Sequence, residues 1–65
     1  MCLARIYGKK KNQEEDVLIC DSIANIIPEG EKIRLLDIFG DEIIVEGTLV
    51  SMDLERSTVK IALAD

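Results

Sequence analysis

The chain has 65 residues, of which 48% are hydrophobic, and its 13 acidic and 8 basic side chains give a net charge of −5. This length allows one domain, residues 1–65, which buries only about 60% of the surface that the unfolded chain exposes. The acidic charge disfavours general binding to nucleic acid, because it repels phosphate backbones. The sequence has no histidine, so it lacks the commonest general base and zinc ligand. We therefore expect one small domain that is not an enzyme.

The amino-terminal segment and the apolar content indicate where the protein works and how it assembles. Met1–Tyr7 has no long apolar stretch of the kind a signal peptide needs, and no apolar run approaches the ~20 residues that span a bilayer. We expect a cytoplasmic protein with reduced thiols and no membrane contact. The hydrophobic fraction is more than a monomer of this size hides easily, and two-fold association is the commonest outlet. The sequence therefore predicts a homodimer.

The first half of the chain alternates short apolar runs with turn residues. Three strands are expected, at Cys2–Tyr7, Asp16–Cys20 and Ala24–Ile27. The polar loop of residues 8–15 joins the first two strands in a hairpin. Asp21-Ser22 either starts one helical turn or bends the chain, and Pro28-Glu29-Gly30 ends the third strand.

The second half continues the same pattern. Four strands are expected, at Lys32–Phe39, Glu42–Glu46, Thr48–Asp53 and Thr58–Leu63. Gly47 permits a bulge or a sharp bend between two of them. Strands this short, with no helix-period segment longer than a turn or two, predict an all-β fold. The expected architecture is a small antiparallel barrel or sandwich of six to seven short strands, with at most one helical turn.

Alternation along the last two strands predicts which side chains face the core. The final strand places on one face Val59, Ile61 and Leu63, and on the other Lys60 and Ala62. In the strand before it, Met52 alternates with Val50 and Leu54. We therefore expect Met52 in the core.

Cys2 is the leading candidate for a functional site. Its thiol lies next to the α-amino group, and such groups ordinarily titrate near enough to neutrality for a bound metal to displace their protons. The alternative is that Cys2 is a small apolar residue of the first strand. Cys20 ends the apolar run Val17–Cys20 and is expected to pack within its strand, because free cysteine is among the most buried residue types.

Two groups of charged residues are expected to have structural roles. Lys9-Lys10-Lys11 is the only basic cluster of note and is expected to be a solvated hairpin turn. Asp37, Asp41 and Glu42 offer hard oxygen donors, which suit calcium or magnesium better than a borderline metal. We expect these carboxylates to shape the turn, with Asp41 adopting the backbone angles that the turn needs.

Three segments of the sequence resemble the CooT-type nickel-binding accessory proteins. These segments are Met1-Cys2-Leu3-Ala4, Leu36–Glu42 and Val45-Glu46-Gly47, and the resemblance extends over nearly the whole chain. It implies a small β-rich homodimer that binds Ni(II) through the amino-terminal cysteine, here Cys2. It also implies a role in nickel insertion into carbon monoxide dehydrogenase, and so a nickel-enzyme maturation partner.

The predicted nickel donors come from Cys2 and Met1, in one of two ways. If Met1 is removed, the amine and thiolate of Cys2 form one five-membered chelate ring. Two such pairs from a dimer complete an N2S2 plane, the square-planar arrangement that Ni(II) favours. If Met1 is retained, its amine, the deprotonated amide of Cys2 and the Cys2 thiolate supply three donors from one chain.

Two other functions stay open at this stage. The first four residues also resemble the HypC-type hydrogenase-maturation chaperones, which begin with a functional cysteine. Those chaperones carry a proline where this chain has Arg5-Ile6-Tyr7, and they are longer and end in a helix. The third reading is a small RNA-binding barrel that uses the lysine cluster. The acidic charge disfavours it, and only Tyr7 and Phe39 can stack on bases.

Overall fold

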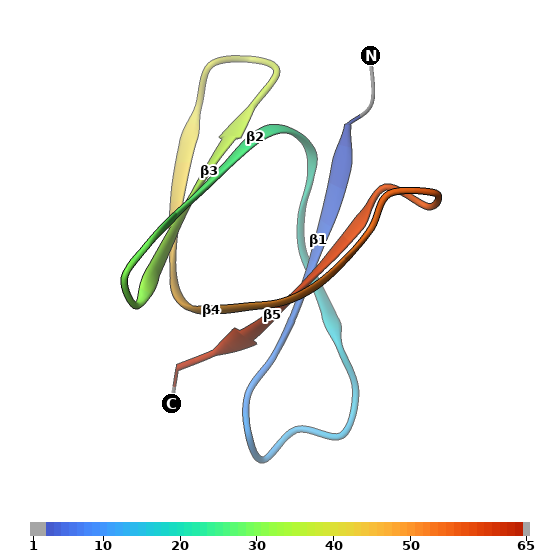
Figure 1. Ribbon diagram of the computed structural model, residues 1–65, viewed down its shortest axis with the longest axis vertical. Coiled ribbons are helices and arrows are strands. Elements are labelled where there is room, and N and C mark those ends of the chain that lie inside the picture. Colours follow the sequence, from blue (N-terminus) through green and yellow to red (C-terminus); the bar gives the residue numbers. More distant parts are fainter. Residues whose placement is uncertain (1–2, 65) are drawn as a thin grey trace.

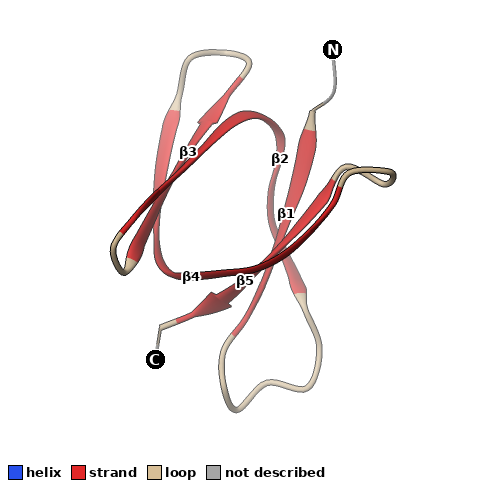
Figure 2. Ribbon diagram, viewed as in Figure 1, coloured by secondary structure: helices blue, strands red, loops and turns tan. Residues whose placement is uncertain are grey.

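The computed structural model describes residues 3–64, which form five β-strands. In chain order these are β1 (Ala4–Lys9), β2 (Val17–Glu29), β3 (Lys32–Asp37), β4 (Glu42–Asp53) and β5 (Thr58–Leu63). Each strand pairs with the next and β1 also pairs with β5, so the sheet closes into a barrel (Figures 1 and 2). Residues 3–64 contain no helix, and hence no helix that could cross a membrane. The all-β prediction is confirmed for this part of the chain.

The predicted count of six to seven strands is wrong, because two strands are longer than expected. β2 pairs with β1 through residues 17–23 and with β3 through residues 23–29. β4 pairs with β3 through residues 42–46 and with β5 through residues 47–53. Each long strand changes partner midway, and in the sequence this change resembles a break between two strands. The two pairs of short strands predicted there are each one strand.

In both strands a residue with a positive φ angle lies at or next to the position where the partner changes. In β2 this residue is Ser22, whose φ is 59°, and its carbonyl accepts a hydrogen bond from the amide of Ile38 at 3.1 Å. The chain bends there without forming a helical turn. In β4 it is Gly47, whose amide donates to the carbonyl of Glu31 at 2.8 Å. The bend expected at Gly47 is present, while the register shift of β4 lies between Leu49 and Ser51.

An antiparallel barrel was predicted, but one of the strand pairs is parallel. Four of its five pairings are antiparallel, but β1 and β5 run parallel, with Arg5 opposite Thr58 and Lys9 opposite Ala62. The odd number of strands requires this. When every strand reverses the direction of the one before it, the first and fifth strands point the same way. A barrel of five such strands therefore closes with one parallel pair.

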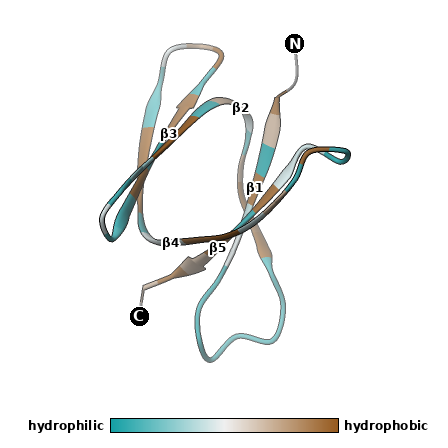
Figure 3. Cartoon of the chain, viewed as in Figure 1, coloured by the Kyte–Doolittle hydropathy of each residue, from teal (hydrophilic) through white to brown (hydrophobic). Residues whose placement is uncertain are grey.

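The core consists of apolar side chains that point into the barrel. Among the described residues six hydrophobic side chains are almost completely buried: Ile6, Ile23, Ile33, Leu35, Val59 and Ile61. Figure 3 shows the hydrophobic segments distributed over all five strands. The alternation predicted for β5 is confirmed, because Val59 and Ile61 are buried, Leu63 is half-buried, and Lys60 and Ala62 are exposed. Each buried side chain of this size contributes about 1.5–3 kcal/mol to folding.

The prediction that Met52 lies in the core is wrong. Its side chain is 54% exposed, and those of Val50 and Leu54 are 62% and 84% exposed. The register shift between Leu49 and Ser51 places Met52 opposite the buried Val59, so Met52 does not lie on the wrong face of the strand. It is exposed because it lies next to the end of β4, at Asp53, where few other side chains cover it. The end of β4 and the turn that follows it therefore present apolar side chains to solvent.

Candidate functional site

The two predicted metal-site residues, Met1 and Cys2, lie outside the described residues. The description begins at Leu3, which lines an apolar pocket of about 320 Å³ at the start of β1. The other apolar residues of this pocket are Ala4, Ile26, Met52, Leu54 and Val59. The amide of Arg5 donates to the carbonyl of Ser57 at 2.9 Å, which holds the start of β1 beside the turn between β4 and β5. We call this the amino-terminal pocket.

The amino-terminal pocket has an unusually exposed apolar rim. Met52 and Leu54 are both more than half exposed, although they are large hydrophobic residues. Water contact with such side chains is unfavourable, and exposed apolar patches commonly mark interaction sites. The residue directly before Leu3 in the sequence is Cys2. The chain therefore leads from the candidate cysteine into an apolar surface that has no cover within residues 3–64.

Cys20 is half-buried in β2 and packs against the core, as predicted. Burial raises the pKa of the Cys20 thiol, and the negative charges of Asp21 and Asp37 raise it further. At neutral pH this side chain is therefore a protonated thiol, which is a poor nucleophile and a poor metal ligand.

This shift predicts that Cys20 reacts slowly with thiol reagents. In a Cys2→Ser variant Cys20 is the only thiol. The rate of its reaction with a disulfide reagent is measured as a function of pH and compared with that of a free cysteine peptide. The rise in rate should occur at a higher pH for Cys20 than for the peptide. Because the pKa of Cys20 is higher in the folded than in the unfolded protein, its protonated thiol contributes to the free energy of unfolding at low pH. This contribution is lost as the pH rises through the pKa of the folded protein. If the rate of Cys20 depended on pH in the same way as that of the peptide, the pKa of Cys20 would not be raised.

The carboxylates of the β3–β4 turn have the structural role that was predicted, though not in every detail. Asp37 Oδ1 accepts hydrogen bonds from the amides of Phe39 and Asp41, both at 2.9 Å. The residue with positive φ in this turn is Gly40, at 90°, so the expectation for Asp41 is wrong. Among residues 3–64 no group of three or more carboxylates and thiols is arranged to hold a metal ion.

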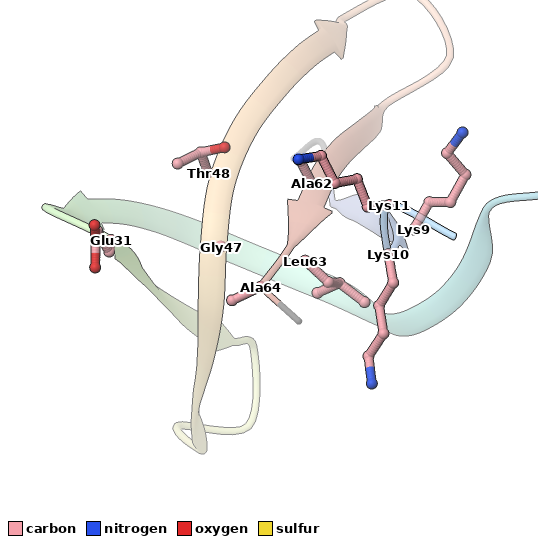
Figure 4. A pocket seen from close by; sticks show the side chains of 9 residues that line it. All are labelled: Lys9, Lys10, Lys11, Glu31, Gly47, Thr48, Ala62, Leu63 and Ala64. Carbon is pink, nitrogen blue, oxygen red and sulfur yellow. The ribbon is translucent and has the colours of Figure 1, made fainter. Parts of the chain in front are cut away.

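The lysine cluster lies at the other end of β1, where it lines a pocket of about 590 Å³ (Figure 4). Lys10 and Lys11 are exposed, and Lys9 is half-buried at the end of the strand. Residues from the far end of the sequence complete this pocket, including Ala62, Leu63 and Ala64. This juxtaposition could not be predicted from local sequence patterns, because only the parallel pairing of β1 with β5 brings Lys9 beside Ala62.

Comparison with known proteins identifies the family. The family model described as "CO dehydrogenase accessory protein CooT" matches residues 1–62. The fold is similar to a crystal structure described as a candidate CooT from Carboxydothermus hydrogenoformans, with a TM-score of 0.80 and 20% sequence identity over 98% of this chain and 100% of that one. No curated protein matches the sequence. Because the family model covers nearly all of its residues, the chain belongs to the CooT family of CO dehydrogenase accessory proteins.

Proposed function

We propose that this protein is a homodimer that binds Ni(II) through Cys2 and supplies it to carbon monoxide dehydrogenase. The proposal rests mainly on the burial and the raised pKa of the other cysteine, Cys20. Cys20 packs against the core with a raised pKa, so Cys2 is the one cysteine left for a metal. The match to the family of CO dehydrogenase accessory proteins includes Cys2 and supplies the client enzyme. It also favours this function over hydrogenase maturation.

The chemistry of the amino terminus suits nickel as a cargo. A thiolate with amine or amide nitrogen is a donor set that Ni(II) accepts in a square plane. With Met1 removed, each chain supplies one nitrogen and one sulfur, and two chains are needed for one ion. With Met1 retained, each chain supplies three donors and an outside ligand fills the fourth position. An ion held at a chain end is reachable by a partner protein, as delivery requires.

The amino-terminal pocket supports a second copy as the structure that completes the site. Its rim residues Met52 and Leu54 are exposed. A two-fold contact at this pocket would bury both residues in each of the two chains. Leu3 belongs to the same pocket, so a contact formed there brings the two copies of Cys2 toward the symmetry axis. The apolar surface and the incomplete donor set therefore call for the same partner, a second copy of this chain.

Native mass spectrometry with added Ni(II) tests the proposal directly. We expect a dimer that carries one nickel ion if Met1 is absent and two if it is present, and the measured mass distinguishes these forms. A Leu54→Lys variant should weaken the dimer by at least about 10-fold, since burial of a leucine is worth about 1.5–3 kcal/mol. The matched control is Phe39→Lys, which changes another exposed apolar residue, 78% exposed, in the β3–β4 turn. A protein that stays monomeric and free of nickel would refute the proposal.

A further inference from the structure

The outer surface of β1, β5 and β4 carries three pockets that join into one groove. The first lies at the lysine end and shares Lys9 and Ala62 with the second. The second shares Asp16 and Lys60 with the third, which reaches Arg5 at the start of β1. The groove therefore runs along the whole length of β1. We call this surface the basic face.

Charge on the basic face is opposite to that of the molecule as a whole. Six of the eight basic residues line the three pockets: Arg5, Lys9, Lys10, Lys11, Arg56 and Lys60. Only three of the thirteen acidic residues do so: Asp16, Glu31 and Asp53. The face thus carries a formal charge of +3 in a chain of −5, and the remaining residues carry −8. The protein is strongly polarised.

Ion pairs on this face neutralise some of the cations and not others. Lys60 Nζ lies 3.5 Å from Asp16 Oδ2, and Arg56 Nε lies 4.0 Å from Asp53 Oδ2. The guanidinium of Arg5 donates to a backbone carbonyl, that of Arg56, at 3.4 Å. Within residues 3–64, neither Arg5 nor any of the three lysines 9–11 forms an ion pair. Uncompensated positive charge therefore stands at both ends of the groove.

The spacing of these charges suits an extended ligand. Arg5 and Lys9 lie on the same strand four residues apart, which corresponds to about 13 Å between their Cα atoms. The residues opposite them on β5 are small, Thr58 beside Arg5 and Ala62 beside Lys9, while Tyr7 and Lys60 form the pair between them. Figure 4 shows the lysine end, with Ala62 close to the lysine side chains and Thr48 to one side of them on β4. A ligand with negative charges along about five extended residues would match both ends.

We propose that the basic face binds an extended acidic segment of a partner protein. Single-stranded nucleic acid is the less suitable occupant, because its binders stack several bases on aromatic rings. Tyr7 is the only aromatic residue among those that line the three pockets. A polypeptide needs no such rings, and its carboxylates are recognised by lysine and arginine side chains. This binding does not involve the proposed nickel ligands. Among residues 3–64 the groove shares only Asp53 and Thr58 with the amino-terminal pocket, and lysines 9–11 lie at the other end of the groove.

The test uses a fluorescein-labelled peptide of ten glutamates and the full chain, measured by fluorescence anisotropy at low salt. Lys9→Glu should weaken binding by at least about fivefold, because it replaces attraction by repulsion at the groove. The matched control is Lys32→Glu, which makes the same charge change at an exposed residue of β3, outside the basic face. It should alter the affinity by less than about twofold, since Lys32 is exposed and does not line the groove, so solvent and salt screen its charge.

Three results would overturn the proposal. The peptide could fail to bind at low salt, both variants could lose affinity equally, or a labelled ten-nucleotide single strand of RNA could bind more tightly than the peptide. The amide NMR signals of residues 5–9 and 58–62 should shift on addition of the peptide, which locates the binding. Because Lys9→Glu leaves the amino terminus unchanged, its nickel content in native mass spectrometry should match that of the parent protein. A failure of this proposal is thereby distinguished from a failure of nickel binding.

Discussion

Substitution of alanine for Gly47 is expected to prevent stable folding of the barrel. A Cβ atom at this position would collide with the backbone carbonyl oxygen of Ala62 and lie 3.1 Å from the Cγ2 of Ile61. The first of these atoms belongs to the backbone of the neighbouring strand, so it cannot rotate away. Relief requires β4 and β5 to separate at the point where β4 changes partner. We expect a loss of about 3 kcal/mol or more, which is a large part of the stability of a domain this small.

Gly30→Ala is the matched control for this substitution. Gly30 also has a positive φ, 62°, but no atom lies within 4 Å of the Cβ position. Alanine there costs only the backbone strain, about 1–2 kcal/mol. Thermal unfolding followed by circular dichroism compares the two, and 1 kcal/mol corresponds to a shift of about 4–8 °C in Tm for a domain of this size. Equal Tm values for the two variants would show that the contact with Ala62 is not what restricts Gly47.

The second large effect is expected at the metal site, where Cys2→Ser should abolish tight nickel binding. The substitution replaces a thiolate by a hydroxyl, which stays protonated near neutral pH and is a weak ligand. Loss of residues that merely support a ligand lowers metal affinity by about 10–100-fold, so loss of the ligand itself should cost at least ~100-fold. Isothermal titration with Ni(II) measures this change in affinity.

Cys20→Ser is the matched control, since it makes the same atomic change at the cysteine that packs against the core. It should retain full nickel affinity once circular dichroism has shown that it is folded. In the parent protein the affinity should fall as the pH is lowered below 7, because the thiol and the amine must lose protons to bind the metal. Nickel binding that is unchanged in Cys2→Ser, or lost in Cys20→Ser, would assign the site to other residues.

Much of the fold follows from local sequence patterns, while its connectivity does not. The alternation in β5 predicts its buried and exposed faces, because the pleat alone determines them. The continuity of β2 through Ser22 could not be predicted in this way. A serine with positive φ is uncommon, and the bend depends on a tertiary hydrogen bond from Ile38. Met52 was misplaced for a different reason. It lies opposite the buried Val59, but its position near the end of β4 leaves it 54% exposed, and alternation along one strand does not reveal where the barrel stops covering that strand.

The candidate sites differ in how far the sequence could reveal them. The position of Cys2 beside the amino terminus can be recognised from the sequence, as can the role of Cys20. The amino-terminal pocket and the basic face could not be predicted, because each combines residues from β1 with residues about 50 positions later. The lysine cluster alone resembles an ordinary solvated turn. The lysine cluster lies beside Lys60 and Ala62 only once β1 has paired with β5 and the barrel has closed.

The parallel pairing of β1 with β5 also determines how the molecule responds to mechanical load. Because these neighbouring strands point the same way, the chain enters β1 at one end of the barrel and leaves β5 at the other (Figure 1). Tension applied through the two ends pulls these strands past each other along their length. The ladder between Arg5–Lys9 and Thr58–Ala62 is then sheared as a unit, and its hydrogen bonds share the force instead of opening one after another.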